Sequence, residues 1–279
     1  VNARKDVLVT ARATQNVLEI TAGIAGAFVG IGGSAAVIVI DSATHAHIGT
    51  DRTTGGTLVA NVDDSTGARG AAGGNVLVSA TDETDIDVVA GGVGAGAVGI
   101  GAAAAVTTVS KDTRAYIGDH AAVDALGNGS SLAGIYSTDI DTKADLRGLA
   151  VQAVSSESLF TLGVAGGGAV YFALGGAVSV EIIDSDTTAY IGAGADINQR
   201  TLATNFGSVH AAQSVNVTAV NDVSSISAAA GVAGAIVGVG AAVDVGVLLN
   251  DTTAYIGRDA AVKAAHDVHV NAFSRKDVD

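Results

Sequence analysis

The stretch Val237-Gly-Val-Gly-Ala-Ala-Val-Asp-Val-Gly-Val247 has a period of two, with valine or alanine at each odd-numbered position. A period of two places alternate side chains on opposite faces of an extended chain, so this pattern predicts a β-strand. A helix would instead hold several interior glycines, each costing roughly 1 kcal/mol relative to alanine. We therefore predict a strand in which Val243 faces the core and Asp244 lies on the wetter face.

The same alternation recurs earlier in the chain. It covers residues 29–39 and 172–182, where Glu181 falls on the face opposite the large apolar residues. Shorter alternations begin at Val7, Val76 and Val215. With 38 glycines, no proline and 4% aromatic residues, the core must be thin and regular, as in repeat proteins. We predict an all-β fold, an elongated β-solenoid.

A short motif marks the repeat. The sequence Ala-Tyr-Ile-Gly occurs three times, and a weakened form, Ala-His-Ile-Gly, occurs once. The motif residues are Tyr116, Ile117, Gly118, Tyr190, Ile191, Gly192, Tyr255, Ile256 and Gly257, with His47, Ile48 and Gly49 in the weakened copy. We expect the motifs to stack on one side of a single solenoid, with His47 occupying a tyrosine position in the ladder.

The motif sets the boundaries of the copies. Aligned on the motif isoleucine without a gap, the copies start at Asp6, Asn75, Leu149 and Ser214, and a truncated copy starts at Asp267. Residues 1–279 are thus predicted to be one repeat array, cut from a longer protein. At roughly 18–20 residues a turn, each copy would form about three rungs, and the segment a rod of roughly 65–75 Å.

The copies differ in length after the motif. The extra residues lie within 50–74, 119–148 and 193–213. Insertions at one point of a repeat map to one face of a solenoid, often the binding face. We expect these three ranges to project from one side as loops.

Composition excludes several functions. The formal net charge of −14 argues against nucleic acid as a partner and against an anionic membrane surface. Without cysteine the chain has no disulfide, thiolate metal site or cysteine nucleophile. We find no arrangement of serine, histidine and aspartate that suggests catalysis, and we predict that the chain is not an enzyme and has no cofactor.

Three weaker patterns in the sequence could indicate a binding site. Gly94, Gly96 and Gly99 spell a dinucleotide-binding fingerprint, but they lie in a repeated small-residue strand. His45 and His47 share one strand face and could hold a metal. The acidic residues of Asp82-Glu-Thr-Asp-Ile-Asp87, and Asp139, Asp141 and Asp145, could hold Ca²⁺, but they match no established calcium loop. A solvated face is the simpler interpretation of both acidic groups.

Membrane insertion is the alternative to a solenoid. Uncharged windows at 20–40, 88–110, 158–180 and 223–243 are long enough to span a bilayer as helices. They consist of Gly, Ala and Val rather than Leu and Phe, so their insertion would be weakly driven. We therefore favour strands, with a membrane as an unfavoured partner.

The repeats resemble those of a known family. Asp184-Ser-Asp-Thr-Thr-Ala-Tyr-Ile-Gly192, Ala115-Tyr-Ile-Gly-Asp-His-Ala-Ala-Val-Asp124 and the copy start at Asn75 are similar to repeats of filamentous-haemagglutinin-like and leukotoxin-like adhesins. The resemblance covers essentially the whole chain. It implies a right-handed parallel β-helix that serves as a stalk at the bacterial surface or in a biofilm matrix, after type V or two-partner secretion.

Two functions follow as expectations. The first is a structural stalk with adhesive insertions, whose partners are neighbouring repeats and possible surface receptors or polysaccharides. The second is a self-assembling extracellular fibre or matrix subunit, in which copies pair end to end. A membrane-embedded Gly/Ala-rich array is a third and weaker alternative.

Overall fold

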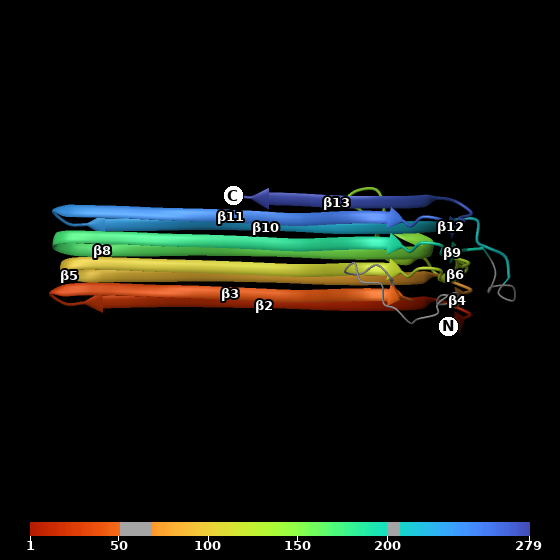
Figure 1. The fold of residues 1–279 in the computed structure, drawn as a ribbon, viewed down its shortest axis with the longest axis horizontal. Coiled ribbons are helices and arrows are strands. Elements are labelled where there is room, and N and C mark those ends of the chain that lie inside the picture. The colour runs from red at the N-terminus through yellow and green to blue at the C-terminus, as the bar shows by residue number, and fades with distance from the viewer. Residues whose placement is uncertain (51–68, 200–206) are drawn as a thin grey trace.

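The computed structural model describes residues 1–50, 69–199 and 207–279. It is all-β, with 80% strand, and no helix occurs in these ranges. The prediction of an all-β fold is confirmed. The long strands run side by side along the longest axis of the molecule (Figure 1).

The strands fall into a long and a short class. The long strands are β2 (Val7–Gly26), β3 (Val29–Ile48), β5 (Val76–Ile117), β8 (Lys143–Ile191), β10 (Gln213–Gly234), β11 (Val237–Ile256) and β13 (Val268–Val278). The short strands are β1 (Asn2–Ala3), β4 (Arg69–Ala72), β6 (Ala122–Ala125), β7 (Leu132–Tyr136), β9 (Asp196–Ile197) and β12 (Ala261–Val262).

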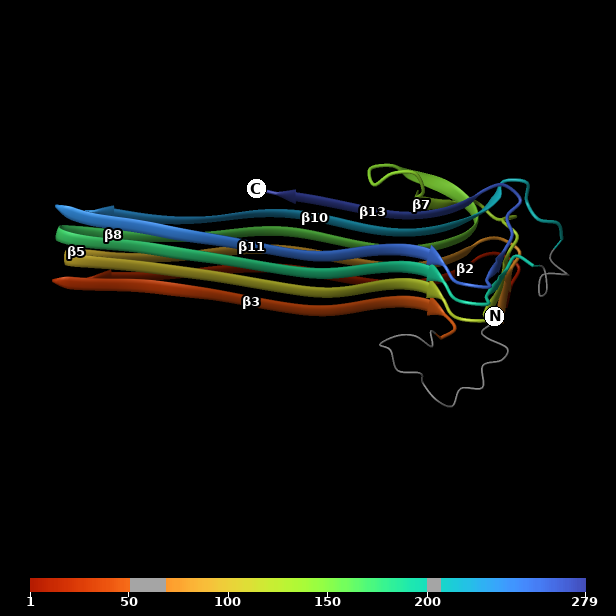
Figure 2. The same cartoon turned by 45° about the horizontal axis from the view of Figure 1, so that its top comes forward.

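Each copy runs out along the long axis, turns and runs back. In the first copy β2 runs out and β3 returns, and in the fourth β10 runs out and β11 returns (Figure 2). In the second and third copies, β5 and β8 each contain both directions. We call one outward stretch, its return stretch and the short strand beside them a rung.

Neighbouring rungs pair in parallel, residue for residue. Val76 pairs with Val7 on one side and with Leu149 on the other. The pairing then continues from Leu149 to Val215 and from there to Val268 in β13. At the other end of the repeat, Ile48, Ile117, Ile191 and Ile256 pair in succession, so the motifs stack on one side.

The third copy departs from a gap-free alignment by one residue. Gly148, not Leu149, pairs with Ser214 and so occupies the start position. The cause lies in the turn at the far end, where Gly96 pairs with Ala169 but Val98 pairs with Phe172. The third copy therefore accommodates one additional residue in its turn.

The expected number of rungs is wrong. Each copy forms one wide rung rather than three narrow ones, and the long dimension follows the strands rather than the stack. Four rungs and the start of a fifth occupy only about 19 Å along the stacking direction, at about 4.8 Å per rung. The physical reason is that nothing within the alternating stretches breaks them: β2 and β3 each continue for 20 residues.

Each of the three predicted insertions contains one short strand of a rung. The short strands form a five-stranded sheet in the order β1-β4-β6-β9-β12. β4, β6 and β9 lie inside the ranges 50–74, 119–148 and 193–213, so these are not simply projecting loops. Within them, 51–68 and 200–206 fall outside the described residues. In the second copy β7 adds an antiparallel pairing to β8.

Two regions of the rungs have different interiors. We call the end with the motifs and the short strands the base, and the windows 20–40, 88–110, 158–180 and 223–243 the arm. In the base, valine, leucine and isoleucine point inward; examples are Val76, Leu149 and Ile117, all at most 1% exposed. In the arm the inward positions hold mainly glycine, alanine and serine.

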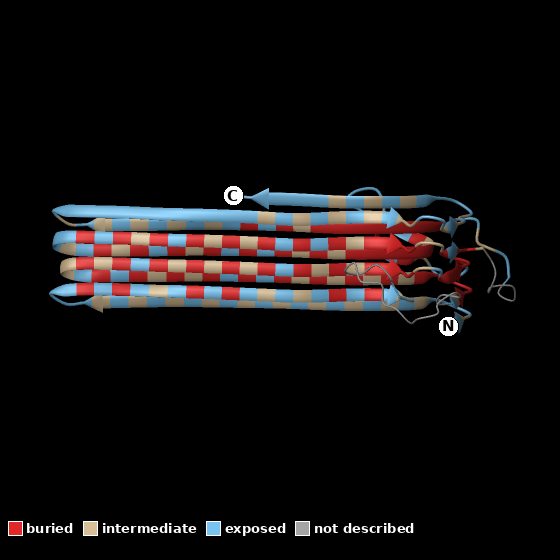
Figure 3. Cartoon of the chain, viewed as in Figure 1, coloured by how far each residue is buried: buried red, intermediate tan, exposed pale blue. Residues whose placement is uncertain are grey.

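The predicted inside and outside of the arm are reversed. Val178 is 41% exposed although strands flank it on both sides, whereas Ser179 is fully buried. Buried and exposed positions alternate along the inner long strands (Figure 3). Val243 and Asp244 pair with Val178 and Ser179, so Val243 faces outward and Asp244 inward. The reason is the closeness of the two layers: a methyl group on Gly101 would lie 2.0 Å from the carbonyl oxygen of Gly166. Where the layers are this close, large side chains can therefore only point outward.

Candidate functional site

The motif residues build a ladder of stacked rings at the base. The ring of His47 lies 4.9 Å from that of Tyr116, with an interplanar angle of 7°. Tyr116 and Tyr190 are 4.8 Å apart, and Tyr190 and Tyr255 are 4.9 Å apart, both nearly parallel. These spacings equal the separation of paired strands, so the in-register pairing sets the stacking. His47 thus takes a tyrosine position and bonds the Gly49 carbonyl oxygen at 2.7 Å through Nδ1.

A charged cluster lies inside the rungs, between base and arm. Nζ of Lys111 lies 2.9 Å from Oδ1 of Asp82 and 2.9 Å from Oε1 of Glu157, and all three side chains are fully buried. Ser42 and Thr44 donate hydrogen bonds to the other oxygen of Asp82, at 2.7 and 2.8 Å. Three consecutive rungs therefore share one internal ionic network.

The pKa of Asp82 reflects two opposing effects in this cluster, burial on one side and hydrogen bonds and charge on the other. Burial by itself would raise the pKa of Asp82. The hydrogen bonds from Lys111, Ser42 and Thr44 and the charge of Lys111 outweigh burial, and the pKa lies below its ordinary value of 3.8. Asp82 is thus held in its ionised form inside the protein.

A second acidic group forms a ladder on the outer surface of the base. Asp112, Asp186 and Asp251 pair in succession across three rungs. Partial burial, then the charges of Asp184, Asp251 and Asp112, raise the pKa of Asp186. Like charges directly opposite one another destabilise a sheet, so this ladder is a site of repulsion.

The residues considered for metal binding do not converge. Nε2 of His45 lies 3.2 Å from Asp112, while His47 stacks in the ladder. Asp82 points inward to Lys111, but its neighbour Glu83 points outward to Arg12 at 2.7 Å. Within residues 1–50, 69–199 and 207–279, no three histidine or acidic side chains gather as a metal site requires.

The other acidic residues considered for Ca²⁺, Asp139, Asp141 and Asp145, do not converge either. Asp139 accepts hydrogen bonds from backbone amides, Asp141 pairs with Arg275 at 2.6 Å, and Asp145 accepts a hydrogen bond from Ser131. Each of these carboxylates already has its own donor. The group therefore offers no shared oxygen cage for Ca²⁺.

The glycine fingerprint is not a nucleotide site. Gly94, Gly96 and Gly99 lie within strand β5, around the turn at the tip of the arm. A phosphate-binding fingerprint needs a helix N-terminus after the glycines. Here the glycines allow the two layers to approach, since a methyl group on Gly94 would lie 2.0 Å from the Ile100 carbonyl oxygen.

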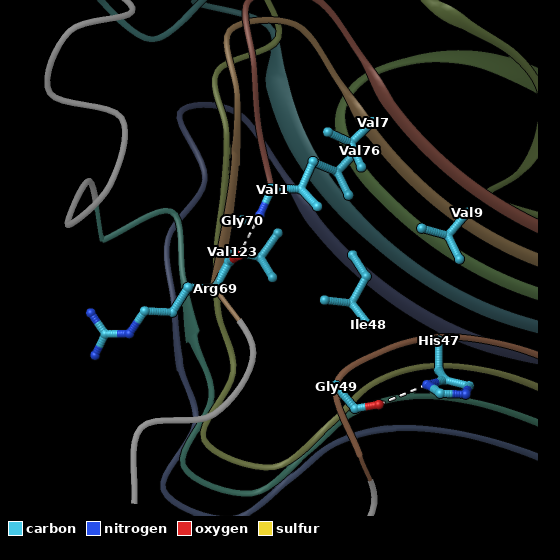
Figure 4. A pocket seen from close by; sticks show the side chains of 10 residues that line it. All are labelled: Val1, Val7, Val9, His47, Ile48, Gly49, Arg69, Gly70, Val76 and Val123. Atoms are coloured by element: carbon cyan, nitrogen blue, oxygen red, sulfur yellow. Dashed lines mark hydrogen bonds between the residues drawn. The ribbon is translucent and has the colours of Figure 1, made fainter. Parts of the chain in front are cut away.

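The exposed end of the first rung holds a hollow of about 290 Å³ (Figure 4). Val7, Val9 and Ile48 line it, and these residues are the first-rung members of the apolar ladders inside the base. Beside them, the N-terminal ammonium of Val1 donates to the Arg69 carbonyl oxygen at 2.9 Å. The hollow is therefore lined by the first-rung ends of the apolar ladders of the base core.

Comparisons with protein-family models, with curated proteins and with solved structures found no match. The four uncharged windows are strands, so the alternative of membrane-spanning helices is wrong for them. The part of the chain that the structure describes has no helix suited to crossing a membrane.

Proposed function

We propose that the chain is a structural segment of a right-handed β-solenoid array, the stalk of a large adhesin-like bacterial protein. The observation that supports this is the continuous register: every copy pairs with the next from base to arm, and β13 continues the pattern on β10. Each rung presents the next with the same ladders of valine, isoleucine and stacked rings. In such proteins stability comes from contacts between adjacent repeats.

The proposed stalk is a broad ribbon. Each copy adds one rung of about 4.8 Å to its length and a strand pair of about 20 residues each way to its width. The resemblance to filamentous adhesins supports an extracellular or biofilm location, with surface receptors or polysaccharides as partners. Neither an enzymatic role nor a cofactor is part of this proposal.

A self-assembling fibre is the second candidate, and the register that all rungs share favours it. In the described residues the first rung presents the apolar hollow beside Val7, and β13 pairs with β10 alone. Unpaired strand edges invite pairing with another chain. Because the last and first rungs share a register, contacts between copies would be head-to-tail and would not close.

Sedimentation of Ala272→Pro tests whether the rung edges are stacking surfaces. Asp267 and Asp279, directly before and after β13, bond to β10 through the backbone, so even-numbered residues such as Ala272 turn their amides away from β10. Proline at 272 removes one outward donor. We expect the wild type to associate end to end as added salt screens its net charge of −14, and the variant to associate far less.

Ala272→Val is the matched control, because it keeps the amide and should associate like the wild type. Equal association of the proline variant and the wild type would contradict edge stacking. A wild type that stays monomeric at every salt and protein concentration would reject the fibre and leave stacking confined to one chain.

A further inference from the structure

The return strands carry an apolar outer surface in the arm. We call it the return-strand face: the outward side chains of residues 29–39 in β3, 98–108 in β5, 172–182 in β8 and 237–247 in β11. They pair across the rungs in six rows, from the row of Val29 and Val98 to that of Val39 and Thr108. No row contains a charged residue. The most exposed members are Val29, Ile31, Val37, Val39, Val237, Val239 and Val243, each at 49–70%.

The size of this face matches a protein interface. Six rows at about 6.6 Å span about 40 Å, and four strands at about 4.8 Å span about 19 Å, so the face covers roughly 750 Å². A standard protein–protein interface buries about 800 Å² on each partner, whereas patches on monomers are usually a few hundred Å². The face is therefore large enough for a stable dimer.

The opposite outer face of the arm is a weaker candidate. Of its four uncharged rows, that of Gly26, Ala95, Gly168 and Gly234 holds only small residues, and that of Ala22, Gly91, Val164 and Ala230 holds one large residue. Asp87 enters the row that begins with Leu18. Less apolar area is thus available there, and a charge lies at its border.

The distribution of charge favours one orientation of two copies that dock through this face. Directly beyond the return-strand face lie Asp41 and Asp184, followed by the acidic ladder that includes Asp112 and Asp186. Two copies docked with their tips in the same direction would bring these carboxylates together. With their tips in opposite directions, the two acidic bases lie at opposite ends of the pair, well beyond a Debye length of about 10 Å at 0.1 M salt.

We propose that the return-strand face docks on the same face of a second copy, with the two arms antiparallel. The two-fold axis then runs along the stacking direction, so both stacks of rungs point the same way. Each further rung adds roughly 190 Å² to each side of the contact. The contact is separate from the rung edges, so it would join two ribbons laterally whether or not they also stack end to end.

Two aspartate substitutions in one strand test the face. Val178 lies on the return-strand face and is 41% exposed, and Val164 lies on the opposite face and is 38% exposed. We expect Val178→Asp to weaken the dimer measured by sedimentation about 30-fold or more, because the charge is desolvated in the contact. Val164→Asp should leave the dimer unchanged. Circular dichroism of both variants checks that the strands are retained.

Single cysteines test the orientation, since the chain has none of its own. Ala104 lies near the middle of the face, and Tyr171 lies at the tip of the arm and is 62% exposed. With antiparallel arms, a short thiol-reactive linker should join Ala104→Cys to its partner copy but not Tyr171→Cys. Joining through Tyr171→Cys alone would contradict the antiparallel arrangement.

Two further results would overturn the proposal. One is equal weakening of association by Val164→Asp and Val178→Asp. The other is binding of the wild type to phosphatidylcholine vesicles that both substitutions abolish, since lipid would then cover both faces. Loss of end-to-end stacking in Ala272→Pro with the lateral dimer retained would separate this contact from the proposed array.

Discussion

Replacing Lys111 by methionine is expected to destabilise the chain by about 3–5 kcal/mol, as measured by urea unfolding. The ammonium group lies 2.9 Å from carboxylate oxygens of both Asp82 and Glu157, and all three side chains are fully buried. Without Lys111 two carboxylates remain buried next to each other with no cation. Removing one partner from a buried pair is much more damaging than replacing the whole group by apolar residues.

Lys276→Met is the control for this prediction. Lys276 is exposed on β13, and its loss should change stability by less than about 0.5 kcal/mol. Adding Asp82→Asn and Glu157→Gln to Lys111→Met should recover much of the loss, because no buried charge is then left uncompensated. A Lys111→Met variant within about 1 kcal/mol of the wild type would show that the cluster is hydrated or open.

Because of this cluster, acid should affect the stability of the wild type and of Lys111→Met in opposite directions. The pKa of Asp82 lies below its ordinary value of 3.8, since the hydrogen bonds and charge of Lys111 outweigh burial. The unfolded state therefore binds this proton first, and the contribution of Asp82 to stability is lost as pH falls below 3.8 and through the lowered pKa. In Lys111→Met, protonation removes an unpaired buried charge. Mild acid should therefore reduce the difference in free energy of unfolding between the wild type and Lys111→Met.

Gly167→Ala is expected to destabilise the chain by about 1–3 kcal/mol, whereas Gly168→Ala should be neutral or stabilising by up to about 1 kcal/mol. A methyl group on Gly167 would lie 2.5 Å from the carbonyl oxygen of Leu174 in the facing layer. At Gly168 nothing lies within 4 Å of that position. The two residues are adjacent in one strand, so strand propensity and distance from the turn are nearly the same for both.

Thermal or urea unfolding of the two glycine variants measures how closely the layers of the arm approach. Equal stabilities would mean that the layers are separated enough to admit a methyl group. A larger loss for Gly168→Ala would mean that the inward and outward positions are exchanged. Either result would contradict the close, glycine-lined interior.

The strands and their stacking could be predicted from the sequence, but the orientation of the arm could not. The two-residue period around Val243 shows that two faces exist, and the motif shows which residues lie side by side. Which face points inward depends on the gap between two layers, and one strand does not encode that gap. Because large residues usually fill cores, the pattern predicts Val243 inward, whereas the narrow gap admits only small residues there.

The alternation fails to predict the buried cluster for a related reason. It predicts that acidic residues such as Glu181 mark the wetter face, but Glu181 is 1% exposed and accepts a hydrogen bond from Thr161 at 2.7 Å. A usable signal is present in the sequence: Asp82 and Lys111 are opposite in charge and lie in the outward and return stretches of the second copy, and Glu157 lies in the third. Comparing the charges of the outward stretch with those of the return stretch suggests a pair.

The predicted width of a rung is wrong because it rests on the length of a typical solenoid turn. Narrow rungs need a turn every few residues, usually made by glycine with asparagine, aspartate or proline. The stretch that became β2 contains none of the usual turn pairs, and it continues for 20 residues. The uninterrupted alternation was therefore the better guide to rung width.

The distance between spin labels at Asn16→Cys and Asp277→Cys tests the one-rung-per-copy arrangement most directly. Asn16 pairs with Asp85, Asp85 with Ser158, Ser158 with Ser224, and Ser224 with Asp277. Four rung spacings separate the two positions, which predicts about 19 Å between their backbones. Three rungs per copy would place them about 58 Å apart, and a distance near that value would contradict the account.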